Sequence, residues 1–374
     1  MGRTKTIVAS KGFRANASPS KSKKNVPQPL PTPALVNKAQ SLMGEMNYEL
    51  ARRFIQRILE IEPNHVEARE MLGIIEIEEG NVDDARTLFT SLVPPSQTAP
   101  SPPSYSAYLY LAQLTDSDPR HALSQYQAAV DLLLLLIKGK ERIEPSELDD
   151  ADRNSDAALR RTVISALVAM VEIWMSSDLC YEPDAEQTCD ALVTLAINSD
   201  PGNVEALECL GSVRMSQSRP DEARQALEKA WKVLKELEPD DPRIPPLPTR
   251  LSLTRRFLEL SLFSQALSLI QSILASDDEE IDAWYLQGWC FFLMGEQVKE
   301  TGENIARDCL EACRTFYRQG GHDDQELIDH VEVLIKSLET AGFRSSPDNG
   351  DEVVDSAEED WEDDDETGPD VEMG

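Results

Sequence analysis

The sequence predicts an all-α fold: a right-handed superhelical solenoid of about seven helix-turn-helix repeats with a C-terminal capping helix. The first observation is a period of 34 residues, in which small and larger apolar residues recur in the next repeat: Ala51, Ile55 and Ile58 return as Ala85, Phe89 and Leu92. The second is a glycine that recurs at one phase of the first helix of a repeat: Gly73, Gly211 and Gly288. A fixed period of this length is typical of solenoids, in which each unit packs only on its neighbours.

The repeat domain is expected over residues 32–342 and begins with two regular repeats. The first has helices over 34–46 and 48–61 and ends at Pro63, because proline cannot continue a helix. The second spans about 66–99, and Gly80-Asn81 makes the turn between its helices. A proline-rich stretch over 94–103 predicts an inserted loop.

The middle of the domain is less regular. The third repeat has helices over 105–114 and from Ala122 to about Lys138. The polar stretch 139–155 predicts a long excursion, and helices over 156–176 and 183–198 form an irregular fourth repeat.

The last three repeats resume the regular pattern. Repeat five covers 204–238, and a proline-rich turn near 239–248 leads into repeat six at 247–280. Repeat seven starts at Ile281 and carries an insertion over 295–302. An amphipathic helix over 323–342 is expected to cap the stack, since a terminal repeat needs a polar outer face.

The two ends differ from the repeats in composition. Residues 1–31 hold seven basic residues, no acidic residue and several prolines, which predicts a disordered basic arm. The arm can be read as a solubilising segment, a nuclear import signal around Lys21 to Lys24 that binds an import factor, or a mitochondrial transit peptide. The prolines argue against the transit helix. Residues 343–374 hold fourteen acidic residues around Trp361 and predict a disordered acidic tail.

Charge and composition restrict the partners. The chain has 36 Lys and Arg against 68 Asp and Glu, a formal net charge of -32, which repels nucleic acid and anionic membranes and attracts basic proteins. No apolar run is long enough for a signal peptide or a membrane span. The six cysteines lack CxxC spacing and indicate reduced core residues of an intracellular protein.

The sequence offers no pattern for catalysis. It lacks a glycine-rich phosphate loop, its four histidines are isolated from cysteines at ligand spacing, and no serine pairs with a histidine. We therefore expect no catalytic centre, no cofactor and no metal site, and the protein is not predicted to be an enzyme.

The 34-residue repeat resembles the tetratricopeptide repeat, in which the first helices of successive repeats line a groove that binds polypeptide. Carried onto this chain, the groove phases of that family give a mixture of acidic, apolar and aromatic residues, which suits a basic segment with apolar anchors. The predicted partner-binding residues are Glu67, Glu70, Ile74, Ile77 and Glu78 in repeat two, Glu205, Glu208 and Met215 in repeat five, and Tyr285 and Trp289 in repeat seven.

The whole layout resembles the fungal dedicated assembly chaperones of large-subunit ribosomal protein four. The resemblance rests on the basic arm that opens Met1-Gly-Arg-Thr-Lys, the repeat array, and the acidic tail with Glu358-Glu-Asp-Trp-Glu-Asp-Asp-Asp. It implies a chaperone that captures one newly made, highly basic ribosomal protein, keeps it soluble until it assembles into the pre-60S subunit, and works in the cytoplasm and the nucleus.

Three other functions use the same fold. The protein can be a scaffold or adaptor subunit of another complex, or a histone chaperone, since histones are equally basic. A co-chaperone that clamps an acidic C-terminal peptide needs a ring of Lys, Arg and Asn in the groove. The acidic residues of repeat two argue against that clamp.

Overall fold

The computed structural model describes residues 31–115, 117–140, 150–239, 241–295, 299–320 and 324–343, without side-chain detail for 150–154 and 299–301. The predicted basic arm and acidic tail therefore lie outside the described residues, apart from one residue each at their inner ends. Most of the excursion expected over 139–155 also lies outside them.

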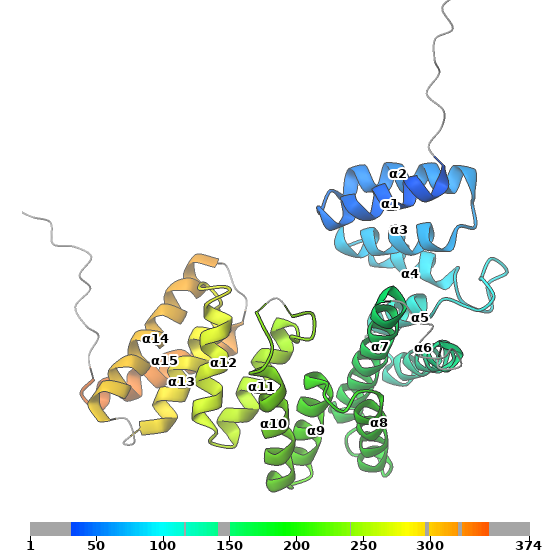
Figure 1. Ribbon diagram of the computed structural model, residues 1–374. Coiled ribbons are helices and arrows are strands. Elements are labelled where there is room, and N and C mark those ends of the chain that lie inside the picture. Colours follow the sequence, from blue (N-terminus) through cyan, green and yellow to red (C-terminus); the bar gives the residue numbers. More distant parts are fainter. Residues whose placement is uncertain are drawn as a thin grey trace, which may run out of the picture. The chain divides into compact units, whose positions relative to one another are not determined.

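The described residues form fifteen helices, and the chain divides into two units at Thr115 (Figure 1). The first unit contains α1 (Thr32–Gly44), α2 (Tyr48–Ile61), α3 (Val66–Glu78), α4 (Val82–Thr90) and α5 (Tyr105–Gln113). The second contains α6 (Pro119–Lys140), α7 (Asp150–Met175), α8 (Ala185–Ser199), α9 (Val204–Ser216), α10 (Pro220–Leu234), α11 (Leu247–Glu259), α12 (Phe263–Leu274), α13 (Ile281–Met294), α14 (Lys299–Gly320) and α15 (Gln325–Thr340).

Each unit stacks helix pairs. In the first unit α1 packs on α2 and α3 on α4, and in the second α7 packs on α8, α9 on α10, α11 on α12 and α13 on α14 (Figure 1). The first helix of each pair, here called the A helix, also contacts the next A helix, so that α7, α9, α11, α13 and finally α15 form a continuous row. The all-α fold class and the repeat architecture predicted from the sequence are confirmed.

The recurring glycines mark the closest approach inside three pairs. A Cβ atom on Gly73 would lie 2.6 Å from the Phe89 ring, and one on Gly211 would lie 2.6 Å from Leu227. Gly288 meets Leu310 in the same way, at 2.7 Å. Glycine in a helix costs about 1 kcal/mol relative to alanine. Here it lets a large residue of the second helix lie directly against the backbone of the A helix.

Left-handed residues close four of the turns within a pair. They have φ angles of 54°, 80°, 57° and 57° at Met46, Gly80, Ser218 and Ser261. In each case the next residue donates its N–H to a carbonyl near the end of the A helix, as from Asn81 to Glu76 at 2.7 Å. Only Gly80 suits this conformation without a Cβ cost, which is why only that turn was evident from the sequence.

Side chains cap the A helices at the start of the repeats. Asn203 accepts a hydrogen bond from the Ala206 N–H at 2.9 Å, and Ser104 accepts one from the Ala107 N–H at 3.0 Å. The His65 Nδ1 accepts from the Ala68 N–H at 3.2 Å. These caps satisfy backbone donors that lack a partner within the helix, and they fix where each A helix begins.

Two insertions are shorter than expected. Helix α6 runs to Lys140 and α7 already begins at Asp150, so the expected excursion over 139–155 leaves only 141–149 between them. The first turn of α7 therefore lies in a stretch whose charged composition predicts a loop, although acidic residues favour the first turn of a helix. Helix α14 starts at Lys299 within the predicted insertion 295–302. Among the described helices, none is both long and apolar enough to cross a membrane.

Candidate partner-binding surface on the A helices

The predicted residues of repeat two lie on α3, where most of them already contact neighbouring helices. Glu67 accepts a hydrogen bond from the Gln40 side chain of α1 at 2.6 Å, and Glu70 accepts one from the Ser104 hydroxyl in front of α5. Ile74 and Ile77 are half-buried against the apolar cluster of α4 and α5. Glu78 is exposed, and its carboxylate lies 3.5 Å from the Tyr48 hydroxyl.

The residues of repeat five repeat this pattern on α9. Glu205 accepts a hydrogen bond from the Ser165 hydroxyl of α7 at 3.0 Å, and Glu208 accepts one from the Ser252 hydroxyl of α11 at 2.7 Å. Glu208 is only 7% exposed, so a partner would feel the charge of its carboxylate but make little direct contact with it. Met215 is half-buried and packs against the core of α10 to α13.

Helix α13 carries the aromatic pair of repeat seven. Tyr285 and Trp289 stack with ring centroids 5.8 Å apart, and the His330 ring of α15 makes a T-shaped contact with each, at centroid distances of 5.7 and 5.8 Å. The Tyr285 hydroxyl hydrogen-bonds to His330 Nδ1 at 2.7 Å. Burial raises the pKa of Tyr285 to about 12, so the hydroxyl stays protonated at neutral pH. We call Tyr285, Trp289 and His330 the aromatic cluster.

These contacts follow a rule that depends on phase. The second residue of the repeat bonds backward to the preceding A helix, as Glu67 and Glu205 do, and Asp282 pairs with Arg255 of α11 in the same sense. The fifth residue bonds forward, as Glu70, Glu208 and Tyr285 do. The predicted groove positions therefore link successive A helices, in addition to any role in binding a partner.

The second unit also brings a third carboxylate to the two of α9. The charge of Glu172 on α7 helps raise the pKa of both Glu205 and Glu208, although burial is the largest cause for each. Burial also raises the pKa of Glu172 itself. Among the ion pairs of the described residues, the one that involves these three carboxylates joins Arg256 to Glu208, with 3.9 Å between Nε and Oε1. We call Glu172, Glu205 and Glu208 the acid triad.

Sequence reasoning missed Glu172 and His330. Glu172 lies on the long helix of the irregular fourth repeat, where the 34-residue phase is lost. His330 lies on the capping helix, which has no phase of its own to compare. The structure brings Glu205 and Glu208 of α9 close to Glu172, and it brings Tyr285 and Trp289 of α13 into contact with His330. The five residues of α3 belong to the first unit and are described only within it. Their role in binding a partner stays a prediction, as it does for the other five.

Within the described residues, no group of three or more His, Cys, Asp and Glu side chains is arranged to hold a metal ion. The five buried cysteines have raised pKa values because of burial, and none is paired in a disulfide. The arrangement on the A helices offers carboxylates and aromatic rings for non-covalent recognition.

Comparison with known proteins supports the fold and the resemblance. A family model for tetratricopeptide repeats matches residues 36–100. A Schizosaccharomyces pombe protein described as a probable assembly chaperone of rpl4 is 29% identical over 297 residues, which cover 76% of this chain and 84% of that protein. An Emericella nidulans protein with the same description is 27% identical over 355 residues, covering 88% of this chain and 87% of that one.

Solved structures give the same picture. An assembly chaperone of RpL4 (Acl4, residues 1–338) matches with a TM-score of 0.63 and 29% identity, covering 73% of this chain and 99% of that chain. The Cut9–Hcn1 structure of the APC/C matches with a TM-score of 0.52 and 12% identity, over 83% of this chain and 50% of that one, and shows the fold alone. The resemblance to the fungal assembly chaperones of ribosomal protein four is confirmed by these matches.

Proposed function

We propose that this protein is a dedicated chaperone for a newly made, strongly basic protein of the large ribosomal subunit, of the kind that its relatives are named for. In this proposal the client binds to the A-helix face of the repeats, stays soluble there, and is released during assembly of the pre-60S subunit. The descriptions of the relatives suggest the client, and the chemistry of the second unit supports a basic one.

The acid triad is the observation that carries the proposal. The charge of Glu172 helps raise the pKa of Glu205, and the charges of Glu172 and Glu205 help raise the pKa of Glu208, with one arginine at 3.9 Å from Glu208 to offset them. Such an arrangement is costly in the free protein, since like charges repel in a partly desolvated site. A Lys or Arg side chain of a client relieves that repulsion, so part of the binding free energy comes from the strain of the unbound state.

The aromatic cluster supplies the second kind of contact. The Tyr285 and Trp289 rings are half-buried, so each keeps part of its surface accessible. Aromatic faces attract guanidinium and ammonium groups, and aromatic side chains dominate the affinity of many interfaces. Acids and rings on one row of A helices therefore suit a client segment that alternates basic and apolar residues.

The test compares two double variants that remove the same charge. Glu172→Gln with Glu205→Gln neutralises two of the three carboxylates of the triad and keeps the hydrogen-bond acceptor for Ser165. Glu186→Gln with Asp221→Asn neutralises two exposed acids on the second helices α8 and α10. We expect the first pair to weaken binding of the purified ribosomal client by at least about tenfold at about 0.1 M salt. The control pair is expected to stay within about twofold. Circular dichroism checks the fold of both variants.

Equal losses in the two variants would refute a specific site and leave only the overall negative field. No loss in either would place the client elsewhere on the chain. Because the Debye length falls from about 10 Å at 0.1 M to about 3 Å at 1 M salt, the wild-type protein is expected to lose most of its advantage over the triad variant at high salt.

The alternative functions differ in which protein is bound. A histone chaperone would bind purified histones as tightly as the ribosomal protein and with the same loss in the triad variant. A scaffold subunit would be recovered from cells in a stable complex with proteins other than the ribosomal client. Affinity purification with mass spectrometry distinguishes these outcomes.

We also propose that the protein works in both cytoplasm and nucleus, with the basic arm read by an import factor. Replacing Lys21, Lys23 and Lys24 by Ser in a fluorescent fusion is expected to deplete the nuclear pool. An unchanged distribution would leave the arm as a solubilising segment.

A further inference from the structure

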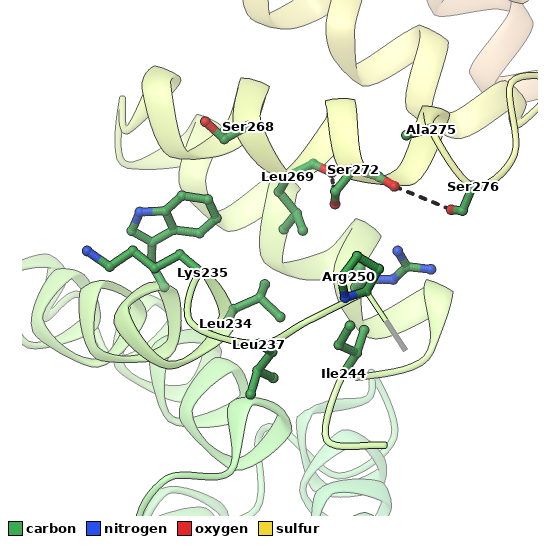
Figure 2. Close-up of a pocket in the computed structure, with 12 residues that line it drawn as sticks. Leu234, Lys235, Leu237, Ile244, Arg250, Ser268, Leu269, Ser272, Ala275 and Ser276 are labelled. Atoms are coloured by element: carbon green, nitrogen blue, oxygen red, sulfur yellow. Dashed lines mark hydrogen bonds between the residues drawn. The ribbon is translucent and has the colours of Figure 1, made fainter. Parts of the chain in front are cut away.

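A cavity lies in the second unit between the second helices α10 and α12 and the start of α11, and none of its lining residues belongs to the acid triad or the aromatic cluster. Its volume is about 610 Å³, within the range of small-ligand sites, about 300–1,000 Å³. Its walls are mainly apolar: Trp231, Leu234, Leu237, Ile244 and Leu269 line it (Figure 2). The client proposal does not use it.

Two charged side chains line this apolar space, Lys235 and Arg250, and Arg250 has a buried donor without a partner. Arg250 lines the cavity, and its Nε atom is buried without a hydrogen-bond partner. Within the described part of the chain, no carboxylate lies at ion-pair distance from Arg250. The other arginines with unsatisfied Nε atoms, Arg69 and Arg256, do donate through their terminal nitrogens. Arg250 is half-buried, and an unpaired Nε–H that is shielded from water is costly, a cost that a hydrogen-bond acceptor in the cavity removes.

The opposite wall supplies hydrogen-bond acceptors. Ser268 and Ser272 lie on α12 and Ser276 in the turn after it, and each hydroxyl already donates to a carbonyl of α12, as Ser272 does to Leu269 at 2.7 Å (Figure 2). Their hydrogens are committed, so the oxygens remain available only as acceptors. A ligand complementary to the cavity therefore has an apolar body, one N–H donor and one carboxylate close by.

The chain itself contains such a ligand. Trp361 is the one aromatic residue of the chain after Phe343, and it stands between Asp360 and Glu362. Its indole has an apolar body and a single N–H donor. We propose that Trp361 of the acidic tail docks in the cavity between α10, α11 and α12, with a flanking carboxylate on Arg250 and the indole N–H on a serine of α12.

The length of the tail permits this docking. The described chain ends at Phe343, just after α15, and the 18 residues from 344 to 361 span about 60 Å when extended. Helix α11 contacts α13, and α13 contacts α15. The path from the end of α15 to the cavity takes two helix-to-helix steps of about 10 Å each and one helix length of about 20–25 Å. The extended tail is therefore long enough to cover it.

Charge decides which part of the tail can dock. Glu238 beside the cavity and the acids after Ser276 repel most of the tail, whereas exposed Lys235 at the rim attracts it. Only a segment in which an aromatic ring accompanies its carboxylates gains enough apolar burial to offset that repulsion. The remaining carboxylates of the tail stay free to bind a basic client. Docking of Trp361 and binding of the client would therefore involve different parts of the tail.

The experiment uses the full chain labelled with 5-fluorotryptophan and recorded by ¹⁹F NMR. The variant Trp361→Phe assigns the tail resonance among the five tryptophans. In the wild-type protein we expect this resonance to be broad and displaced from that of a free tail peptide. Arg250→Met is expected to lower the docking equilibrium constant by at least about tenfold and to shift the resonance to the free position. Ser272→Phe, which fills the cavity from an exposed position, is expected to do the same without changing charge.

Arg219→Met is the matched control, because Arg219 is paired with Glu222 outside the cavity and the variant removes the same charge. It is expected to leave the Trp361 resonance displaced. A sharp wild-type resonance at the free position would overturn the proposal, as would displacement that survives both cavity variants. Displacement that grows with protein concentration would show that the occupant is the tail of another copy and would overturn docking within one chain.

Discussion

The substitution Gly73→Ala tests whether glycine is required where α3 meets α4. The added Cβ would lie 2.6 to 2.9 Å from three atoms of the Phe89 ring. Phe89 is fully buried, and its ring stacks on Tyr110 with centroids 4.7 Å apart, so the ring has little room to retreat. Overpacking of this kind costs about 1–3 kcal/mol. The gain in helix propensity from glycine to alanine offsets about 1 kcal/mol of it.

The matched control is Gly44→Ala in α1 of the same unit, because nothing lies within 4 Å of a Cβ there. It is expected to leave stability unchanged or raise it by up to about 1 kcal/mol. Urea unfolding followed by circular dichroism should therefore separate the two variants by about 1–3 kcal/mol, with Gly73→Ala the less stable. The additional replacement Phe89→Leu, which removes the ring, is expected to reduce the cost of Gly73→Ala in a double-mutant cycle. Equal effects of the two single variants would refute the close approach.

Three further predictions concern buried polar groups in the second unit. Burial raises the pKa of Glu208 above its ordinary 4.5, so protonation favours the folded state and stability falls as pH rises through the carboxyl range. Glu208→Gln is therefore expected to be at least as stable at neutral pH and to unfold with a weaker pH dependence, and a large loss of stability would contradict this. Buried Arg307 donates to Glu311, Glu339 and the Phe343 carbonyl. Arg307→Met is expected to cost about 3 kcal/mol and to speed hydrogen exchange in α15, whereas unchanged exchange there would show that these bonds do not hold the helix. Iodoacetamide at mildly alkaline pH is expected to label only the exposed Cys180 in the folded chain, because burial raises the pKa of Cys290, Cys309 and Cys313 to about 12. Mass spectrometry of the labelled peptides would detect any second reactive thiol, which would contradict this expectation.

The sequence predicted the helices well where their signals are local. The limits of α2 agree with the expected 48–61, because Asn47 caps its start and Pro63 follows its end. Prediction was weaker at α7 and α14, whose first turns are charged and were read as loop. Charge alone does not distinguish a solvated helical turn from an excursion, since the difference lies in packing farther along the helix.

The candidate site was predicted only in part. Phase within the 34-residue period placed Glu205, Glu208, Tyr285 and Trp289 on A helices, but it gave no sign that they bond to the helices beside them. Their partners Ser165, Ser252 and His330 lie 40, 44 and 45 residues away in the chain. Those separations differ from the 34-residue period because of the intervening loops and the irregular fourth repeat.

The sequence by itself determined the pairs of helices, the glycines at their closest approach, and the acidic character of the A helices, because each of these is encoded by neighbours along the chain. Only the tertiary structure decided which carboxylates lie close together, which aromatic rings meet His330, and that Arg250 lines an apolar cavity without a carboxylate at ion-pair distance. The physical reason is that a repeat specifies which face of a helix is apolar. The rotation and offset of adjacent helices decide which polar side chains on those faces come within hydrogen-bond distance.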